Sequence, residues 1–124
     1  MTLAFPKPKD LKILLVYIRV LRDGREICNR MHPDGRAEYR WRTGLMVDRQ
    51  GYRCCLEAYA PMCPGPLSIE EATFDHEFGR GAGGGKRDDR IELPDGTWIN
   101  GAAHALCNEW KGSRYIDYNR GRKP

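Results

Sequence analysis

Residues 72–112 read ATFDHEFGRGAGGGKRDDRIELPDGTWINGAAHALCNEWKG, and this stretch decides the fold. Its β-branched and aromatic start predicts a short strand over 72–77, which a glycine-rich basic loop follows over 79–90. An Asp-Gly pair with apolar neighbours predicts a hairpin over 91–100. The alanine-rich run 102–110 predicts a helix that the next glycine ends. Strands followed by a helix in one short chain predict an α+β fold.

The same stretch holds residue types suited to cleaving a phosphodiester bond. That reaction needs a base to deprotonate water and a cation to neutralise charge on the phosphate. Histidine is the natural base near pH 7, and His76 follows Asp75, a hard oxygen ligand for Mg²⁺ or Mn²⁺. Asn108 offers a neutral amide oxygen, and His104 lies four residues before it, so both would share one helix face. A single divalent ion could then lie between that face and Asp75.

Three segments, TFDH, GRGAGGG and NGAAHALCNEWKG, resemble the HNH endonuclease family. The resemblance covers residues 49–114 and combines an Asp-His pair on a strand with a Cys-Asn-x2-Lys-Gly pattern on a helix. It implies an α+β fold with a ββα-metal core, also called an HNH or His-Me finger. It also implies a hydrolase, a metal-dependent DNA endonuclease with a histidine base and one divalent ion, Mg²⁺ or Mn²⁺.

The resemblance implies roles for individual residues. His76 corresponds to the general base, and Asp75 and Asn108 correspond to ligands of the ion. Asn100 corresponds to the residue that orients the His76 base. In colicin-type nucleases a helical histidine joins the catalytic ion, and we favour this role for His104.

The five cysteines leave two interpretations open. With no recognisable secretory leader, a disulfide framework is not indicated. Many HNH relatives hold a structural zinc on two Cys-x2-Cys pairs, which this chain lacks. A Zn²⁺ site could still form from a mixed set, because cysteine and histidine both suit tetrahedral zinc: Cys54 or Cys55, Cys63, His104 and Cys107. Alternatively, the thiols are buried apolar groups and His104 serves the catalytic ion.

The composition excludes several protein classes. The chain has 124 residues, the usual size of one domain, of which 40% are apolar and 31% charged. A membrane-spanning segment needs a run of about 18 apolar residues, and no such run is present. The apolar stretch near the N-terminus lacks the flanks of a signal peptide, so we expect a cytoplasmic protein.

The charge favours DNA as a partner. The net charge is +4, and arginine outnumbers lysine more than twofold. The planar guanidinium suits phosphate better than an ammonium group does. Such residues could simply form a solvated surface, but in a nuclease they contact the phosphate backbone. We expect these contacts from the arginines of residues 36–42 and from Lys86, Arg87, Arg90 and Lys111.

The chain is expected to divide into three parts. Residues 1–48 form an N-terminal arm with a strand and helix extension. Residues 49–114 form the HNH nuclease domain, and residues 115–124 form a basic tail.

Local patterns predict the elements of the first half. The apolar run 12–22 predicts a strand, and the partial helical period over 36–50 predicts a helix. The segment from His32 to Gly35 has the composition of a turn. Residues 51–67, with three cysteines and three prolines, predict an irregular loop that is cross-linked or bound to metal.

Two other functions fit the same sequence. The first is a catalytically silent, zinc-containing module that binds nucleic acid and needs neither Asp75 nor His76. The second is a scaffold in a larger complex, such as a phage packaging partner. Metal-dependent cleavage of DNA would separate the nuclease from both.

Overall fold

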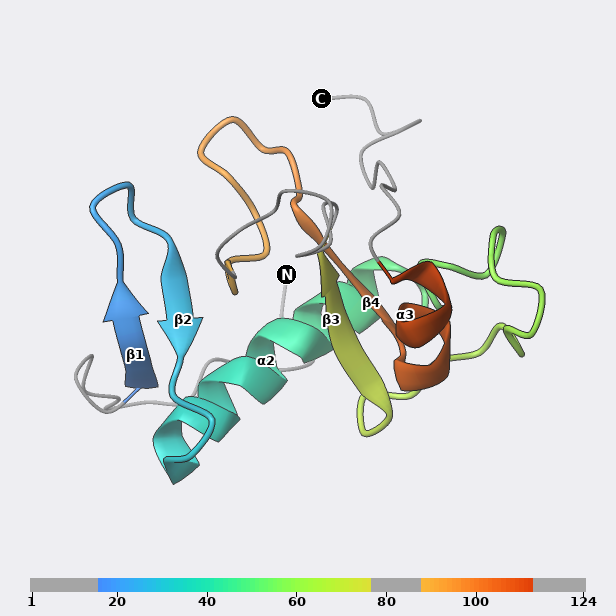
Figure 1. The fold of residues 1–124 in the computed structure, drawn as a ribbon, viewed down its shortest axis with the longest axis horizontal. Coiled ribbons are helices and arrows are strands. Elements are labelled where there is room, and N and C mark those ends of the chain that lie inside the picture. Colours follow the sequence, from blue (N-terminus) through green and yellow to red (C-terminus); the bar gives the residue numbers. More distant parts are fainter. Residues whose placement is uncertain (1–15, 77–87, 113–124) are drawn as a thin grey trace.

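The computed structural model describes residues 16–76 and 88–112. These residues form two helices and two small antiparallel sheets (Figure 1), which confirms the α+β class. Neither helix of this described part has the length and apolar character needed to cross a membrane. The predicted N-terminal arm, the basic tail and most of the glycine-rich loop lie outside the described residues. The finer assignment to a ββα-metal finger stays a prediction.

The first sheet is a hairpin of β1 (Tyr17–Val20) and β2 (Glu26–Cys28), which pair antiparallel. Gly24 lies in the turn with a φ of +83°, a conformation in which an L side chain is strained. The glycine therefore allows the tight reversal between the strands. The strand predicted over 12–22 is confirmed for the residues of β1 only, and residues 12–15 lie outside the described residues.

Helix α2 (Pro33–Arg49) begins earlier than the predicted range of 36–50. His32 is the N-cap, and its Nδ1 accepts a hydrogen bond from the backbone N–H of Asp34 at 3.2 Å. Pro33 suits the first helical position, where its missing N–H would have no intrahelical partner. The predicted turn that starts at His32 is therefore wrong for the next three residues, which form the first turn of the helix.

The second sheet pairs β3 (Ala72–His76) with β4 (Asn100–His104), and β4 leads directly into α3 (Ala105–Lys111). The strands run antiparallel, with the first residue of β3 opposite the last residue of β4. The strand predicted over 72–77 is confirmed for the residues of β3.

The helix predicted over 102–110 begins only at Ala105, so its first three residues were assigned wrongly. These residues pair with β3 instead. Alanine favours a helix only weakly, and tertiary pairing overrides that preference. Ala102 and Ala103 are fully buried, and their small side chains allow neighbouring elements to pack closely on both faces of β4.

The hairpin predicted over 91–100 is also wrong, although its turn is present. The backbone N–H of Leu93 donates to the carbonyl oxygen of Thr97 at 2.8 Å, and Gly96 has a φ of +86°. Residues 91–93 form no strand, because the chain after the turn pairs with β3 rather than with them.

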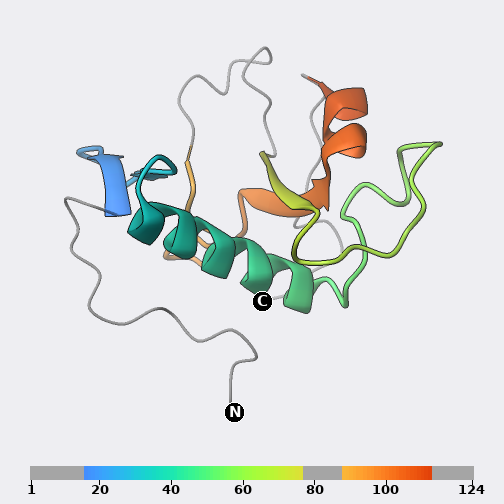
Figure 2. The same cartoon turned by 90° about the horizontal axis from the view of Figure 1, so that it is seen from below.

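The core lies between α2 and the sheet of β3 and β4. Figure 2 shows α2 on one side of these strands and α3 on the other. Side chains of β3 therefore point alternately toward the two helices. Phe74 packs its ring against Tyr39 of α2, while Thr73 contacts Asn108 of α3. The fully buried core residues come from both halves of the chain: Met46, Val47, Leu56, Ala102, Ala103 and Cys107.

Candidate metal and catalytic site

Four side chains with metal-binding atoms converge between the loop after α2, the end of β4 and the start of α3. They are Cys54, Cys63, His104 and Cys107, and their ligand atoms all lie within 4.8 Å of one another. The Nδ1 atom of His104 is 3.7 Å from the Sγ atoms of both Cys63 and Cys107. Three of these residues are buried and Cys63 is half-buried. This Cys3His cluster could hold a metal ion.

The irregular segment over residues 51–67 brings two of the thiols to this place. Gly65 has a φ of +96°, and its carbonyl oxygen accepts a hydrogen bond from the backbone N–H of Cys54 at 2.9 Å. The backbone N–H of Cys55 donates to the carbonyl oxygen of Ala102 at 3.0 Å. Backbone hydrogen bonds within the segment and to β4, rather than a regular element, therefore position Cys54.

His104 is held by its other ring nitrogen. Nε2 lies 2.8 Å from the carbonyl oxygen of Pro66 and 2.8 Å from Oε1 of Glu71. A neutral imidazole that donates from Nε2 keeps its lone pair on Nδ1, which here faces the thiols. Metal-bound histidines usually make such a bond through the nitrogen that does not bind the metal. Neither Pro66 nor Glu71 was identified from the sequence, because neither stands at a recognisable spacing from His104.

Burial disfavours the thiolate form of two thiols of the cluster, those of Cys54 and Cys107. It raises the pKa of Cys107 to about 12, with a further rise from the neighbouring thiols. Burial also raises the pKa of Cys54. A bound cation would favour the thiolates, so metal binding would release protons.

Asp75 and Lys111 form a buried ion pair between β3 and α3. Nζ of Lys111 lies 3.3 Å from Oδ1 of Asp75, and the two side chains are 0% and 2% exposed. Burial raises the pKa of Asp75 to about 6, against the lowering effect of Lys111. The sequence suggested Lys111 as a nucleic-acid contact, whereas the structure places its side chain in the interior.

Asn108 ties α3 to β3. Its Nδ2 donates to the carbonyl oxygen of Phe74 at 2.8 Å, directly before Asp75. The helix face predicted for His104 and Asn108 does not exist, because residue 104 belongs to β4. The structure therefore brings His104 to the cysteines and leaves Asn108 beside β3.

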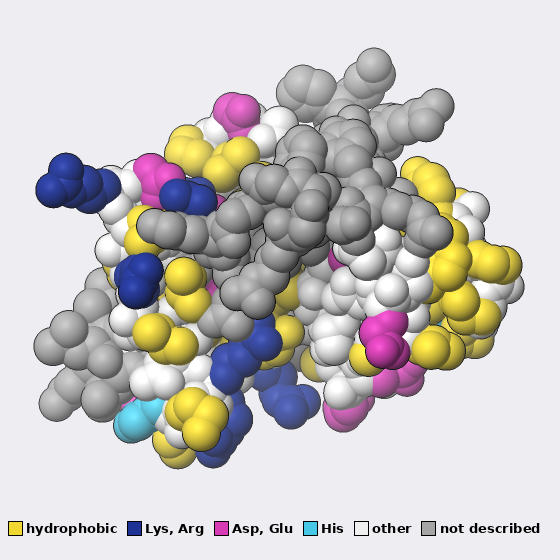
Figure 3. All heavy atoms as spheres, viewed as in Figure 1, with side chains coloured by type: hydrophobic (Ala, Val, Ile, Leu, Met, Phe, Trp, Pro, Cys, Tyr) yellow, Lys and Arg dark blue, Asp and Glu magenta, His cyan; other side chains and the backbone are white. Residues whose placement is uncertain are grey.

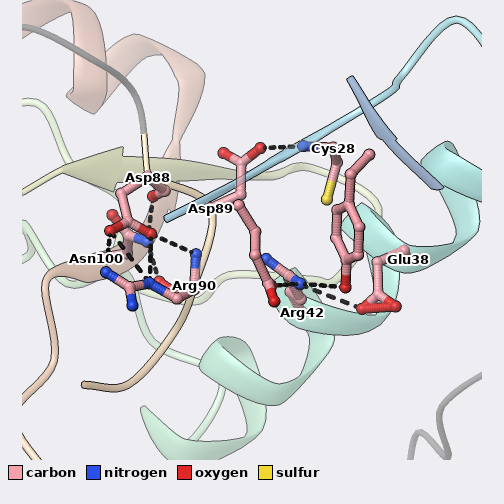
Figure 4. A network of polar contacts seen from close by, with 9 residues as sticks. Cys28, Glu38, Arg42, Asp88, Asp89, Arg90 and Asn100 are labelled. Atoms are coloured by element: carbon pink, nitrogen blue, oxygen red, sulfur yellow. Dashed lines mark hydrogen bonds and ion pairs between the residues drawn. The ribbon is translucent and has the colours of Figure 1, made fainter. Parts of the chain in front are cut away.

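Asn100 lies opposite His76 in the register of the sheet and is fully buried. Its Nδ2 donates to the carbonyl oxygens of Asp88, at 2.9 Å, and of Arg90 (Figure 4). Asn100 thus holds residues 88–90, the last residues of the predicted glycine-rich loop.

Residues 88–90 are also held by β2. Oδ2 of Asp89 accepts a hydrogen bond from the backbone N–H of Cys28 at 2.7 Å, and the N–H of Asp89 donates to the carbonyl oxygen of Glu26 at 2.8 Å (Figure 4). Arg90, a predicted nucleic-acid contact, pairs with Asp88 at 2.6 Å. The N-terminal hairpin therefore supports the end of the predicted glycine-rich loop.

A buried arginine joins this hairpin to α2. Arg42 pairs with Glu38 at 3.2 Å and with Glu26, and it donates to the hydroxyl oxygen of Tyr17 at 2.8 Å. The spacing of Glu38 and Arg42 indicates a helix pair in the sequence, but the partners on the hairpin carry no sequence signal. Lys86 and Arg87, two further predicted nucleic-acid contacts, lie outside the described residues.

A comparison of the chain with protein-family models, with curated proteins and with solved structures finds no match.

Proposed function

We propose that this protein is a metal-dependent DNA endonuclease of the HNH type, which hydrolyses phosphodiester bonds. One observation carries the proposal: Asp75, the residue before His76, is buried against Lys111 of α3, the helix that also carries Cys107 of the Cys3His cluster. The order of β3, β4 and α3 agrees with the ββα core that the sequence resemblance implies.

The proposal assigns a structural Zn²⁺ to the Cys3His cluster. Ligand atoms at zinc-binding distances, arranged tetrahedrally, are separated by about 3.6–3.8 Å. The two contacts from Nδ1 of His104 to thiol sulfurs are 3.7 Å. The donor set also fits, because three thiolates and one imidazole close a structural zinc site. The ion would contribute folding free energy by joining the irregular segment to β4 and α3.

The catalytic part of the proposal uses the facing ends of β3 and α3. His76 would take a proton from the attacking water, and Asp75 would offer a hard oxygen ligand to Mg²⁺ or Mn²⁺. Such an ion, when bound, neutralises charge on the phosphate. Lys111 supplies a fixed positive charge beside Asp75, and Asn108 keeps α3 in register with β3. His104 is assigned to the zinc.

A second function is supported by the same ion pair. Lys111 already balances the charge of Asp75 without an added cation. That arrangement suits a zinc-containing module that binds nucleic acid and does not cleave it. The two functions differ in one property, which is cleavage that depends on a divalent ion.

The test is nicking of supercoiled plasmid by zinc-loaded protein with added Mg²⁺, with added Mn²⁺ and with neither. Omitting the ion is preferable to adding EDTA, because a chelator would also remove the structural zinc. The variant Asp75→Asn keeps the size of the side chain. Its matched control is Asp48→Asn, at an exposed position of α2.

We expect nicking by the wild type and by Asp48→Asn only when Mg²⁺ or Mn²⁺ is present, and none by Asp75→Asn. A protein that binds plasmid but never nicks it would establish the silent module instead. Full nicking activity of Asp75→Asn would show that the Asp75 carboxylate is not needed for cleavage.

A further inference from the structure

A pocket of about 220 Å³ lies between α2 and the chain that enters β3. Three arginines line it: Arg30, from the connection between β2 and α2, and Arg36 and Arg40, from α2 itself. Figure 3 shows Lys and Arg side chains gathered low in the view, over the first half of α2. Glu70 is the one acidic residue of the lining, so the pocket is positively charged.

Arg30 is held in place before any ligand arrives. Its guanidinium carbon lies 3.8 Å from the ring centroid of Tyr39, and one of its terminal nitrogens lies 3.8 Å from Oδ1 of the buried Asp89. Its buried Nε has no hydrogen-bond partner among the described residues. A fixed guanidinium loses little conformational freedom when it binds an anion.

Arg36 and Arg40 are not neutralised by neighbours. Both are exposed, and they stand four residues apart on α2, so their like charges repel each other. Arg36 makes a long hydrogen bond of 3.5 Å to the carbonyl oxygen of Arg30, and Arg40 makes no hydrogen bond or ion pair with the described residues. An anion in the pocket would relieve this repulsion.

The size and walls of the pocket narrow the choice of anion. Pockets for drug-sized ligands measure about 300–1,000 Å³, so this one suits a single group rather than a whole cofactor. A guanidinium group can donate two parallel hydrogen bonds to two oxygens of one phosphate. Ile69 and Ala72 add an apolar wall against which a sugar could pack.

We propose that this arginine pocket binds a phosphate group of a nucleic-acid strand. The choice of a nucleic acid as the source of phosphate rests on the proposed function. Phe74 faces Tyr39 of α2, whereas Asp75 faces Lys111 of α3, so the pocket and the proposed cleavage site lie on opposite faces of β3. The pocket therefore contributes to affinity and takes no part in bond cleavage.

The test measures binding to a fluorescein-labelled DNA duplex by anisotropy, with zinc-loaded protein and no added Mg²⁺ or Mn²⁺. The double variant Arg36→Ala/Arg40→Ala is compared with Arg19→Ala/Arg22→Ala, which removes the same charge from exposed positions of the N-terminal hairpin. We expect the pocket variant to bind more weakly and to lower the slope of log affinity against log salt by about 0.9, the value for one phosphate contact. The hairpin variant keeps the wild-type slope.

Competition with dTMP and with inorganic phosphate identifies the source of the phosphate. If a strand supplies it, unlabelled duplex displaces the probe and neither small ligand does so at millimolar concentration. Displacement of the probe by dTMP at millimolar concentration would overturn the proposal in favour of a free nucleotide, and so would duplex affinity that is unchanged in the pocket variant. An equal loss in both variants would also overturn it, because it would reflect net charge alone. Binding is read without cleavage, so a failure of the nuclease proposal gives a different result from a failure of this one.

Discussion

Cys107 lies in the first turn of α3, where its fully buried thiol contacts His104 of the Cys3His cluster. If the cluster holds zinc, replacing Cys107 by serine removes one of the ligands. We expect the wild type to carry one zinc per chain and Cys107→Ser to lose it. Because metal binding in small domains is largely folding free energy, the melting temperature should fall by more than about 10 °C.

Zinc content by mass spectrometry and thermal melting check this prediction, with Cys55→Ser as the matched control. Cys55 is adjacent in sequence to Cys54 but is not a member of the cluster. We expect this control to retain its zinc. Zinc-free wild-type protein, or a Cys107→Ser protein that melts like the wild type, would show that the thiols are ordinary buried groups.

The sequence identifies candidate ligands but leaves two roles open for His104. The residue types Cys and His indicated a zinc set, and all four members of the cluster were candidates. We favoured His104 as a ligand of the catalytic ion because the predicted helix over 102–110 included this residue. Because His104 ends β4 and its Nε2 is held by Pro66, its Nδ1 faces the thiols. That outcome depends on strand pairing between distant segments, which no local spacing reveals.

At the scale of elements, hydrogen bonds from residues 88–90 to β2 support the end of the predicted glycine-rich loop. Asp89 is fully buried, and its carboxylate accepts the backbone N–H of Cys28. We expect Asp89→Ala to lower the free energy of unfolding by about 1–3 kcal/mol, because the buried N–H loses its acceptor. Urea unfolding, followed by circular dichroism, measures the change.

Asp48→Ala is the control for this substitution, since Asp48 is exposed on α2. Its effect should stay within about 0.5 kcal/mol. If Asp89→Ala is as stable as this control, the contact between residues 88–90 and β2 does not support the structure.

The elements were predictable to different degrees. Strand β3 and most of α2 follow from local composition and period. The start of α2 was missed because the Pro-Asp-Gly sequence after His32 is typical both of a turn and of a helix start, and the imidazole cap decides between them. The start of α3 was missed because the alanines before it are buried in β4, where pairing outweighs propensity.

At the scale of the whole molecule, one core joins the two halves of the chain. Met46 and Val47 of α2 are fully buried against Leu56 and against the alanines of β4. Residues of the predicted N-terminal extension therefore pack against the strands of the proposed site, although the sequence predicted the extension as separate from the nuclease domain. The boundary between residues 48 and 49 stays a prediction.

The proposed function requires His76 to act as the base for DNA hydrolysis. Its most direct test is the rate of plasmid nicking with Mg²⁺ by the variant His76→Ala, measured beside duplex binding by the same preparation. The control is His32→Asn, which keeps a side chain able to cap α2.

We predict that His76→Ala binds duplex and zinc like the wild type but nicks plasmid about 10²–10⁴-fold more slowly, the usual contribution of a general base. His32→Asn should retain both binding and nicking. A folded, zinc-loaded His76→Ala protein that nicks plasmid at the wild-type rate would contradict the account.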